Sequence, residues 1–357
     1  EALYEEYWRR FDDPFWRQEV RQGRLTRPRS DLYMQHFLAS RQCIDIPVKH
    51  LYVEYKFWIE RKRPFSTIRE ELATLAKQGD DFRRILDPKR EDILFDLVTF
   101  IDCFDVRTTY PLLLSLLDRN IPDNDWKLIT IIVQSYLLRR AICGFTTKNY
   151  NRIFLSLTRS LCNSEATPQK ICEHLSGLVG ESTEWPSDSK FAEAWKNRHA
   201  YETLQNARIV YILRRLNDTY IDSRTESITI ESPLTVEHIL PQKWIEHWQL
   251  PDGSMGLTFL ELFDKPPGDI QVDATRRRNS LLQTLGNLTI LTQPLNSSVS
   301  NSSWEVKKPA LLQASLLPIN QQLVTYEDWN EETIEIRSKD LVARALKLWP
   351  GPDRTRG

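Results

Sequence analysis

The sequence predicts a mainly α-helical protein, in which a helical bundle is followed by a helical domain that carries a small unit of two strands and one helix. Up to about residue 180, apolar residues recur at the i, i+3, i+4 and i+7 spacing of amphipathic helices. After about residue 220 the period changes, and short runs rich in Ile, Thr and Val follow. The segment "GESTEWPSDSKF" (180–191) lies between these regions and mixes Gly, Ser and Pro. We therefore predict an α-helical domain at 1–182, a second domain at 183–350 and a tail at 351–357.

Composition limits the class of protein. The chain has 357 residues, of which 41% are hydrophobic and 27% charged, with a formal net charge of −1. These values are typical of a soluble protein with about two cores, and they give no overall signal for binding a polyanion. The five cysteines include no CxxC pair. We therefore expect neither a zinc ribbon nor a disulfide framework, and a cytoplasmic location.

The ends of the chain and its hydropathy lead to two further expectations. No apolar run reaches the ~18 residues that a membrane span needs, so we expect no membrane partner. The sequence begins with Glu1, and "EALYEEYWRRFDDPFW" resembles the interior of a helix. We infer a piece of a longer protein.

The helices of the first domain are predicted by three runs: "ILFDLVTFIDCF" (93–104), "YPLLLSLLDRN" (110–120) and "WKLITIIVQSYLLRRAICGF" (126–145). The Asp and Asn residues of "NIPDND" precede the third run and are suitable N-caps. We expect a packed bundle without chemistry of its own. Its histidines and His199 are interpreted as structural or surface residues: His36, His50, His174 and His199.

The second domain begins with a predicted helix at 191–218, and its strands are predicted at 226–231, 234–240 and 285–292. Between the last two strands, 250–283 is interpreted as an insertion on loops with at most one short helix. A helix at 326–349 closes the domain.

Possible catalytic residues gather at the end of the strand in "TVEHILPQKW" (235–244). Neighbouring strand residues point to opposite faces, but a strand that stops at Pro241 can turn Glu237 and His238 toward one point. A His there can take a proton from water near neutral pH. A carboxylate and an Asn oxygen suit a hydrated Mg²⁺ that binds a phosphate, and the sequence offers Asn287 and Asn296. The pattern favours metal-assisted phosphodiester hydrolysis.

These motifs resemble a known family. Glu-His-Ile-x-Pro, then Asn-Leu-x-x-Leu, then a second Asn nine residues after the first, is similar to the HNH (ββα-metal) endonucleases. "VEHILPQKW", "LGNLTILTQPLN" and "SNSSWEVKK" more specifically resemble the C-terminal nuclease region of the GmrSD-type, modification-dependent restriction enzymes, a group that includes the SspE-like defence proteins.

The resemblance implies a role for each residue. His238 would be the general base, and Glu237 and Asn296 would be ligands of Mg²⁺ or Mn²⁺, with no zinc expected. Asn287 would hold the loop and orient His238.

Basic residues are predicted to contact DNA phosphates. The resemblance implies this role for Lys307 and Lys308, whereas "TRRRN" (275–279) is interpreted either as a phosphate contact or as a solvated loop. The residues predicted to contact DNA phosphates are therefore Arg276, Arg277, Arg278, Lys307 and Lys308. Residues 226–350 contain 16 Asp and Glu against 11 Lys and Arg, which is a formal net charge of −5. We therefore expect only a weak affinity for DNA.

The implied function is a metal-dependent HNH DNA endonuclease that nicks or cuts double-stranded DNA. It would be the effector part of an anti-phage, modification-dependent restriction protein. In the family, an upstream sensor domain hydrolyses nucleotides through an Asp-Gly-Gln-Gln-Arg motif, and neither this motif nor a P-loop occurs here. The alternative is a non-catalytic helical platform that binds DNA or a partner. The DNA modification, sequence preference and oligomeric state stay open.

Overall fold

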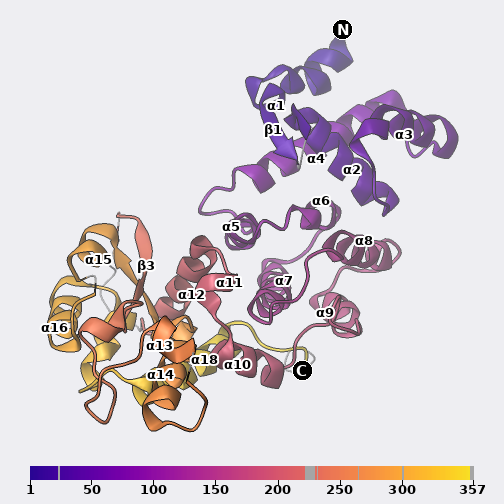
Figure 1. The fold of residues 1–357 in the computed structure, drawn as a ribbon. Helices are drawn as coiled ribbons and strands as arrows, with labels where there is room; N and C mark the ends of the chain where they lie inside the picture. The colour runs from indigo at the N-terminus through magenta and orange to yellow at the C-terminus, as the bar shows by residue number, and fades with distance from the viewer. Residues whose placement is uncertain (23–24, 222–229, 231, 264, 300, 354–357) are drawn as a thin grey trace. The chain divides into compact units, whose positions relative to one another are not determined.

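The computed structural model describes residues 1–22, 25–221, 230, 232–263, 265–299 and 301–353, and these are mainly helical (Figure 1), which confirms the helical class. The described residues form two compact units. Unit 1 contains Glu1–Gln134 and Thr146–Trp185, and unit 2 contains Ser135–Phe145 and 186–353. None of the helices in the described ranges has the length and apolar character of a membrane span.

Unit 1 is helical apart from one small β-hairpin. The strands β1 (Glu19–Gln22) and β2 (Leu25–Pro28) pair antiparallel, with Glu19 opposite Pro28. The other elements are η1 (Tyr4–Trp8), η2 (Arg9–Asp12), α1 (Pro14–Arg17), α2 (Arg29–Gln42), η3 (Val48–His50), α3 (Leu51–Phe57), η4 (Trp58–Lys62), α4 (Ile68–Leu86), α5 (Phe95–Phe104), η5 (Arg107–Thr109), α6 (Tyr110–Leu117), α7 (Asp123–Ile142), α8 (Tyr150–Leu161) and α9 (Pro168–Ser176). The residues of α7 from Ser135 onward belong to unit 2.

The three helices predicted in the first domain are confirmed as α5, α6 and α7. Local sequence explains the ends of α7. Asp123 and Asp125 lie in its first turn, and Arg139 and Arg140 lie in its last turn, so the charges complement the helix dipole. Arg139 also pairs with Asp188 at 2.6 Å, and both residues belong to unit 2.

Unit 2 surrounds a two-stranded antiparallel sheet of β3 (Leu234–His238) and β4 (Leu288–Thr292), in which Leu234 faces Thr292 and His238 faces Leu288. Two of the three predicted strands are therefore confirmed, and the one expected at 226–231 falls almost wholly outside the described residues. The remaining elements are α10 (Asp188–Asn197), α11 (Ala200–Thr203), α12 (Asn206–Asp218), η6 (Trp244–Glu246), α13 (Phe259–Phe263), α14 (Ile270–Leu282), η7 (Leu285–Asn287), α15 (Gln293–Val299), α16 (Trp304–Ala314), α17 (Pro318–Gln321), η8 (Gln322–Thr325) and α18 (Glu331–Leu348).

The prediction that 250–283 holds at most one short helix is wrong. This segment contains α13 and the 13-residue α14, whose N-cap is Asp269. The Asp269 carboxylate accepts a hydrogen bond from the backbone N–H of Val272. The buried side of α14 includes Thr275 and Arg278 beside the apolar residues. Because polar side chains occupy buried positions, the apolar periodicity that identifies a helix is weak in this sequence.

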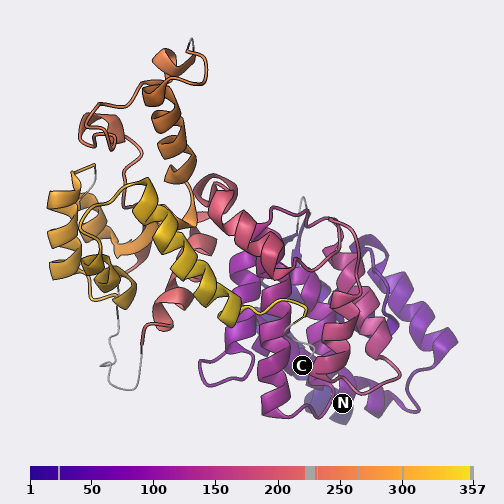
Figure 2. The same ribbon diagram turned by 90° about the horizontal axis from the view of Figure 1, so that it is seen from below.

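Tryptophans dominate the core beside the sheet. Trp244, Trp248, Trp304 and Trp329 pack with aliphatic residues of β4, of the segment between the strands and of the helices that follow. These aliphatic residues are Ile239, Leu240, Leu250, Leu282, Leu291, Val299, Leu311, Leu323 and Ile334. A second contact fixes the start of β4. Helix α18, the long yellow helix in Figure 2, packs on η7. The core therefore holds both ends of the segment that joins β3 to β4.

Candidate functional site

The last two residues of β3 share one pocket. Glu237 and His238 line a cavity of about 310 Å³ together with Asn296, and the other lining residues are Pro241, Gln242, Lys243, Ser297 and Asn301. The strand ends at His238, so the alternation of faces no longer separates the two neighbours. The structure thus brings together three of the four residues for which the sequence predicted a catalytic or metal-binding role.

His238 is held by side chains from other elements. Its Nε2 lies 2.9 Å from Oε1 of Gln283, and the ring of Tyr201 packs edge-on against it with centroids 4.4 Å apart. Burial lowers the pKa of His238 to about 4, against the raising effect of the Gln283 hydrogen bond. The imidazole is therefore neutral near neutral pH and can accept a proton.

The contact with Gln283 selects one tautomer of His238. An amide oxygen can only accept, so Nε2 must carry the hydrogen, and Nδ1 keeps its lone pair. The amide nitrogen of Gln242 lies 3.3 Å from the same Nε2 and would favour the other tautomer, but this contact is longer. Within the described ranges, no hydrogen bond to Nδ1 is found. Nδ1 is thus the atom available as a base.

Glu237 forms a buried ion pair with Lys307. Lysine Nζ lies 2.6 Å from Glu237 Oε1 and also donates to the carbonyl oxygen of His238 at 2.8 Å. Burial raises the pKa of Glu237 and lowers that of Lys307, and the ion pair opposes both shifts. Lys307 is 0% exposed. It therefore positions the carboxylate and the end of β3 from inside the protein, and the structure argues against its predicted contact with a DNA phosphate.

Asn296 lies in α15 and is oriented by its amide nitrogen. Nδ2 donates to Thr235 Oγ1 at 2.9 Å and to the carbonyl oxygen of Val236 at 3.1 Å. Because both bonds use the nitrogen, the amide oxygen is the end left for a ligand in the pocket.

Asn287 lies behind the pocket and is 0% exposed. Its amide oxygen accepts from Leu240 N at 2.8 Å and from Trp329 Nε1 at 3.1 Å. Its nitrogen donates to the carbonyl oxygens of Leu240 at 2.8 Å and Leu282 at 3.0 Å. These bonds tie the segment after β3 to the end of α14, so Asn287 shapes the site without facing it.

The donor set fits a hydrated divalent cation. Glu237 and Asn296 supply a carboxylate oxygen and an amide oxygen to the same pocket, and hard oxygen ligands are those that Mg²⁺ and Mn²⁺ accept. In the part of the chain that the structure describes, no cluster of three or more His, Cys, Asp or Glu side chains is suited to a metal ion. An ion held here would take two protein ligands and complete its shell with water and substrate.

The predicted phosphate-binding residues do not line this pocket. Arg278 is 2% exposed and pairs with Glu331 at 2.5 Å, so the structure argues against a phosphate contact there. The side chains of Arg276 and Arg277 are exposed on α14, where Arg276 donates to the carbonyl oxygen of Lys265 and Arg277 pairs with Glu335. Lys308 donates to the carbonyl oxygen of Tyr326.

Sequence reasoning missed several residues of the site. Gln242 and Lys243 stand within the quoted "EHILPQKW" motif, and Gln283 lies four residues before Asn287, so proximity in the sequence was a usable signal for them. Tyr201 comes from α11, 37 residues before His238, and no local pattern connects the two.

Comparison with known protein families gives a match over the region that contains this pocket. Residues 185–344 match the family model described as "GmrSD restriction endonucleases, C-terminal domain". A search of curated proteins found no match. The matched range contains every residue of the pocket. The resemblance drawn from the sequence is thereby confirmed over residues 185–344, which are similar to the C-terminal domain of the GmrSD restriction endonucleases.

Proposed function

We propose that the pocket at the end of β3 is the active site of a metal-dependent DNA endonuclease of the HNH (ββα-metal) type. The observation that carries the proposal is that Glu237, His238 and Asn296 line one pocket, although Asn296 lies 58 residues beyond His238 in the sequence. Strands β3 and β4 pair antiparallel, and α15 follows β4 directly, which is the order that a ββα unit requires.

In this proposal, His238 Nδ1 accepts a proton from the water that attacks the phosphorus atom. Gln283 accepts the hydrogen bond from Nε2–H throughout, which keeps the lone pair on Nδ1 and stabilises the imidazolium once the proton has moved. Tyr201 restricts rotation of the ring through its edge-on contact. The bond between phosphorus and the ester oxygen breaks on the side opposite the attacking water, and the leaving oxygen takes up a proton from solvent water.

Glu237 and Asn296 would hold the cation, whose charge would stabilise the negative charge that develops on the phosphoryl oxygens. Lys307 fixes one oxygen of Glu237 and leaves the other for this role. Lys243, which is exposed and lines the pocket, would contact the phosphate backbone of the DNA.

The substrate would be double-stranded DNA, and the chain would act as the effector of an anti-phage restriction protein. The match to restriction endonucleases supports this substrate class. A sensor domain outside this chain would recognise modified DNA and deliver it to the nuclease unit. Such delivery would be needed because the negative net charge of 226–350 gives the nuclease unit only a weak affinity for DNA.

A plasmid-nicking assay tests the proposal. Supercoiled DNA is incubated with the chain in Mg²⁺ or Mn²⁺, or in excess chelator. His238→Ala should lower the nicking rate about 10²–10⁴-fold, the usual contribution of a general base. His247→Ala is the matched control, because that imidazole is 54% exposed and lies outside the pocket lining.

Nicking that persists in chelator, or an unimpaired His238→Ala variant, would show that the assignment is wrong. DNA binding without any metal-dependent nicking by the unmodified chain would instead support a non-catalytic platform.

A further inference from the structure

A second pocket lies wholly within unit 1 and has no part in the proposed nuclease chemistry. Its volume is about 340 Å³, and its polar lining residues include Arg21, His36, Asp45, Thr108 and Asn151. We call it the His36 pocket. Cavities of this size are at the lower end of the range that binds small organic ligands.

The floor of the His36 pocket contains polar atoms without hydrogen-bond partners. His36 is 8% exposed, and its Nε2 is buried with no partner among the described residues; the same is true of Thr108 Oγ1. The ring of His36 packs edge-on against Tyr110, with centroids 5.3 Å apart. Burial lowers the pKa of His36 to about 4, so it is neutral and can donate or accept. A buried polar atom left unpaired is unfavourable, and a ligand that pairs with it recovers that loss.

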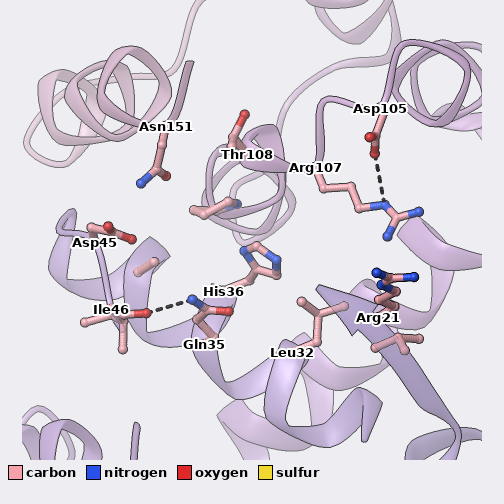
Figure 3. A pocket seen from close by; sticks show the side chains of 13 residues that line it. Arg21, Leu32, Gln35, His36, Asp45, Ile46, Asp105, Arg107, Thr108 and Asn151 are labelled. Carbon is pink, nitrogen blue, oxygen red and sulfur yellow. Dashed lines mark hydrogen bonds and ion pairs between the residues drawn. The ribbon is translucent and has the colours of Figure 1, made fainter. Parts of the chain in front are cut away.

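Two arginines lie together at one end of this pocket. Figure 3 shows the guanidinium groups of Arg21 and Arg107 on one side of the His36 ring, with Asp45 and Asn151 on the other. Arg107 Nε lies 3.7 Å from Oδ1 of Asp105, and the Arg107 side chain is 53% exposed. A phosphate offers several anionic oxygens to two such planar donors at once, whereas a carboxylate offers two oxygens.

The rest of the lining suits a ring. Leu32, Ile46 and Pro111 give the lining its apolar walls. Asp45 and Asn151 can accept hydrogen bonds from amine or hydroxyl groups at the far end.

We propose that the His36 pocket binds a small phosphomonoester that carries a ring, of the class of a nucleoside 5′-monophosphate. Its phosphate would lie against Arg21 and Arg107, and its ring between the apolar walls. The groups of the ring or sugar would pair with His36, Thr108 and Asn151.

Isothermal titration calorimetry of the complete 357-residue chain tests this proposal, with dAMP, phenyl phosphate and inorganic phosphate as probes. We expect saturable binding of dAMP and phenyl phosphate, each at least about tenfold tighter than inorganic phosphate, because the apolar walls contribute only to ligands with a ring. The double variant Arg21→Gln/Arg107→Gln should weaken both ring-bearing ligands at least about tenfold.

Arg90→Gln is the matched control, because Arg90 is exposed on a turn of the same unit and does not line the pocket. Lys243→Ala controls for binding at the pocket of unit 2, and neither control should change the affinity for dAMP.

Three results would overturn the proposal: no saturable binding of either ring-bearing probe, full affinity in the double arginine variant, or loss of dAMP affinity in Lys243→Ala. Both arginine side chains are at the surface, so the variant should fold, and its circular dichroism spectrum checks this.

Discussion

At the scale of single residues, the proposed chemistry depends on which nitrogen of His238 carries the hydrogen. Gln283 decides this, because its amide oxygen lies 2.9 Å from Nε2 and can only accept. Comparable residues that orient a catalytic or metal-binding histidine contribute about 10–100-fold to activity.

Gln283→Leu removes the acceptor and should lower the nicking rate about 10–100-fold. Gln283→Glu keeps an oxygen acceptor and should retain more activity than the Leu variant. The two rates are compared by single-turnover nicking, with thermal unfolding as a check on folding. Equal losses in the two variants would show that Gln283 serves packing and does not select the tautomer.

Site residues could be predicted from the sequence where they stand in short motifs. Glu237, His238, Asn287 and Asn296 stand in short motifs with fixed spacing. Their partners depend on tertiary packing. The pairing of Lys307 with Glu237 joins α16 to β3 across 70 residues, and a lysine in a sequence gives no sign that it will be fully buried.

At the scale of elements, the contact between α18 and η7 positions the strand that follows. Arg337 of α18 is buried and donates to the carbonyl oxygens of Gly286 and Leu288 at 2.7 and 2.8 Å. A Cβ on Gly286 would lie 2.7 Å from the carbonyl oxygen of Ile334 and 2.9 Å from the Cβ of Ser338. Only glycine permits this approach of the two backbones.

Gly286→Ala should therefore destabilise unit 2 by about 1–3 kcal/mol, the usual result of overpacking. It should also lower nicking, because Gly286 directly precedes Asn287, and any shift of Asn287 moves the segment that directly follows His238. Urea unfolding measures the first effect and the plasmid assay the second. A variant with unchanged stability would contradict the close contact.

Elements with a clear apolar period were predictable, and those whose buried face is polar were not. Helices α5, α6 and α7 follow long apolar patterns, whereas α14 buries Thr275 and Arg278 and lies in the segment predicted to hold loops with at most one short helix. Its Arg278 is buried through bonds to Glu331 and to the carbonyl oxygens of Trp248 and Gln249, none of which is near in sequence.

At the scale of the whole molecule, charge limits what the chain can do alone. Residues 226–350 carry a formal −5, with 16 Asp and Glu against 11 Lys and Arg, and Lys307 and Arg278 are buried in ion pairs. These two residues are therefore withdrawn from contact with phosphates, and each phosphate contact that remains contributes to the salt dependence of binding.

We expect this chain to nick DNA slowly and with little sequence preference, and its rate to fall as salt is raised from about 50 to 200 mM, because counterion release weakens at higher salt. Lys243→Ala should reduce both the rate and its salt dependence, whereas Lys339→Ala, an exposed lysine of α18, should change neither. A longer protein that carries the proposed sensor domain should be faster on modified DNA. Tight binding of DNA by this chain at about 150 mM salt would contradict the weak intrinsic affinity.

The most direct measurement of the central claim is chemical rescue of His238→Ala. The substitution removes a buried imidazole from a pocket of about 310 Å³, which leaves space for a free imidazole to enter. Plasmid nicking by this variant in Mg²⁺ or Mn²⁺ is measured as imidazole is added, with His247→Ala and the unmodified chain as controls. If His238 is the general base, added imidazole restores a saturable part of the nicking rate in His238→Ala and does not accelerate either control. If His238→Ala nicks at the rate of the unmodified chain without imidazole, or stays inactive at every imidazole concentration while remaining folded, His238 is not the base of a nuclease site.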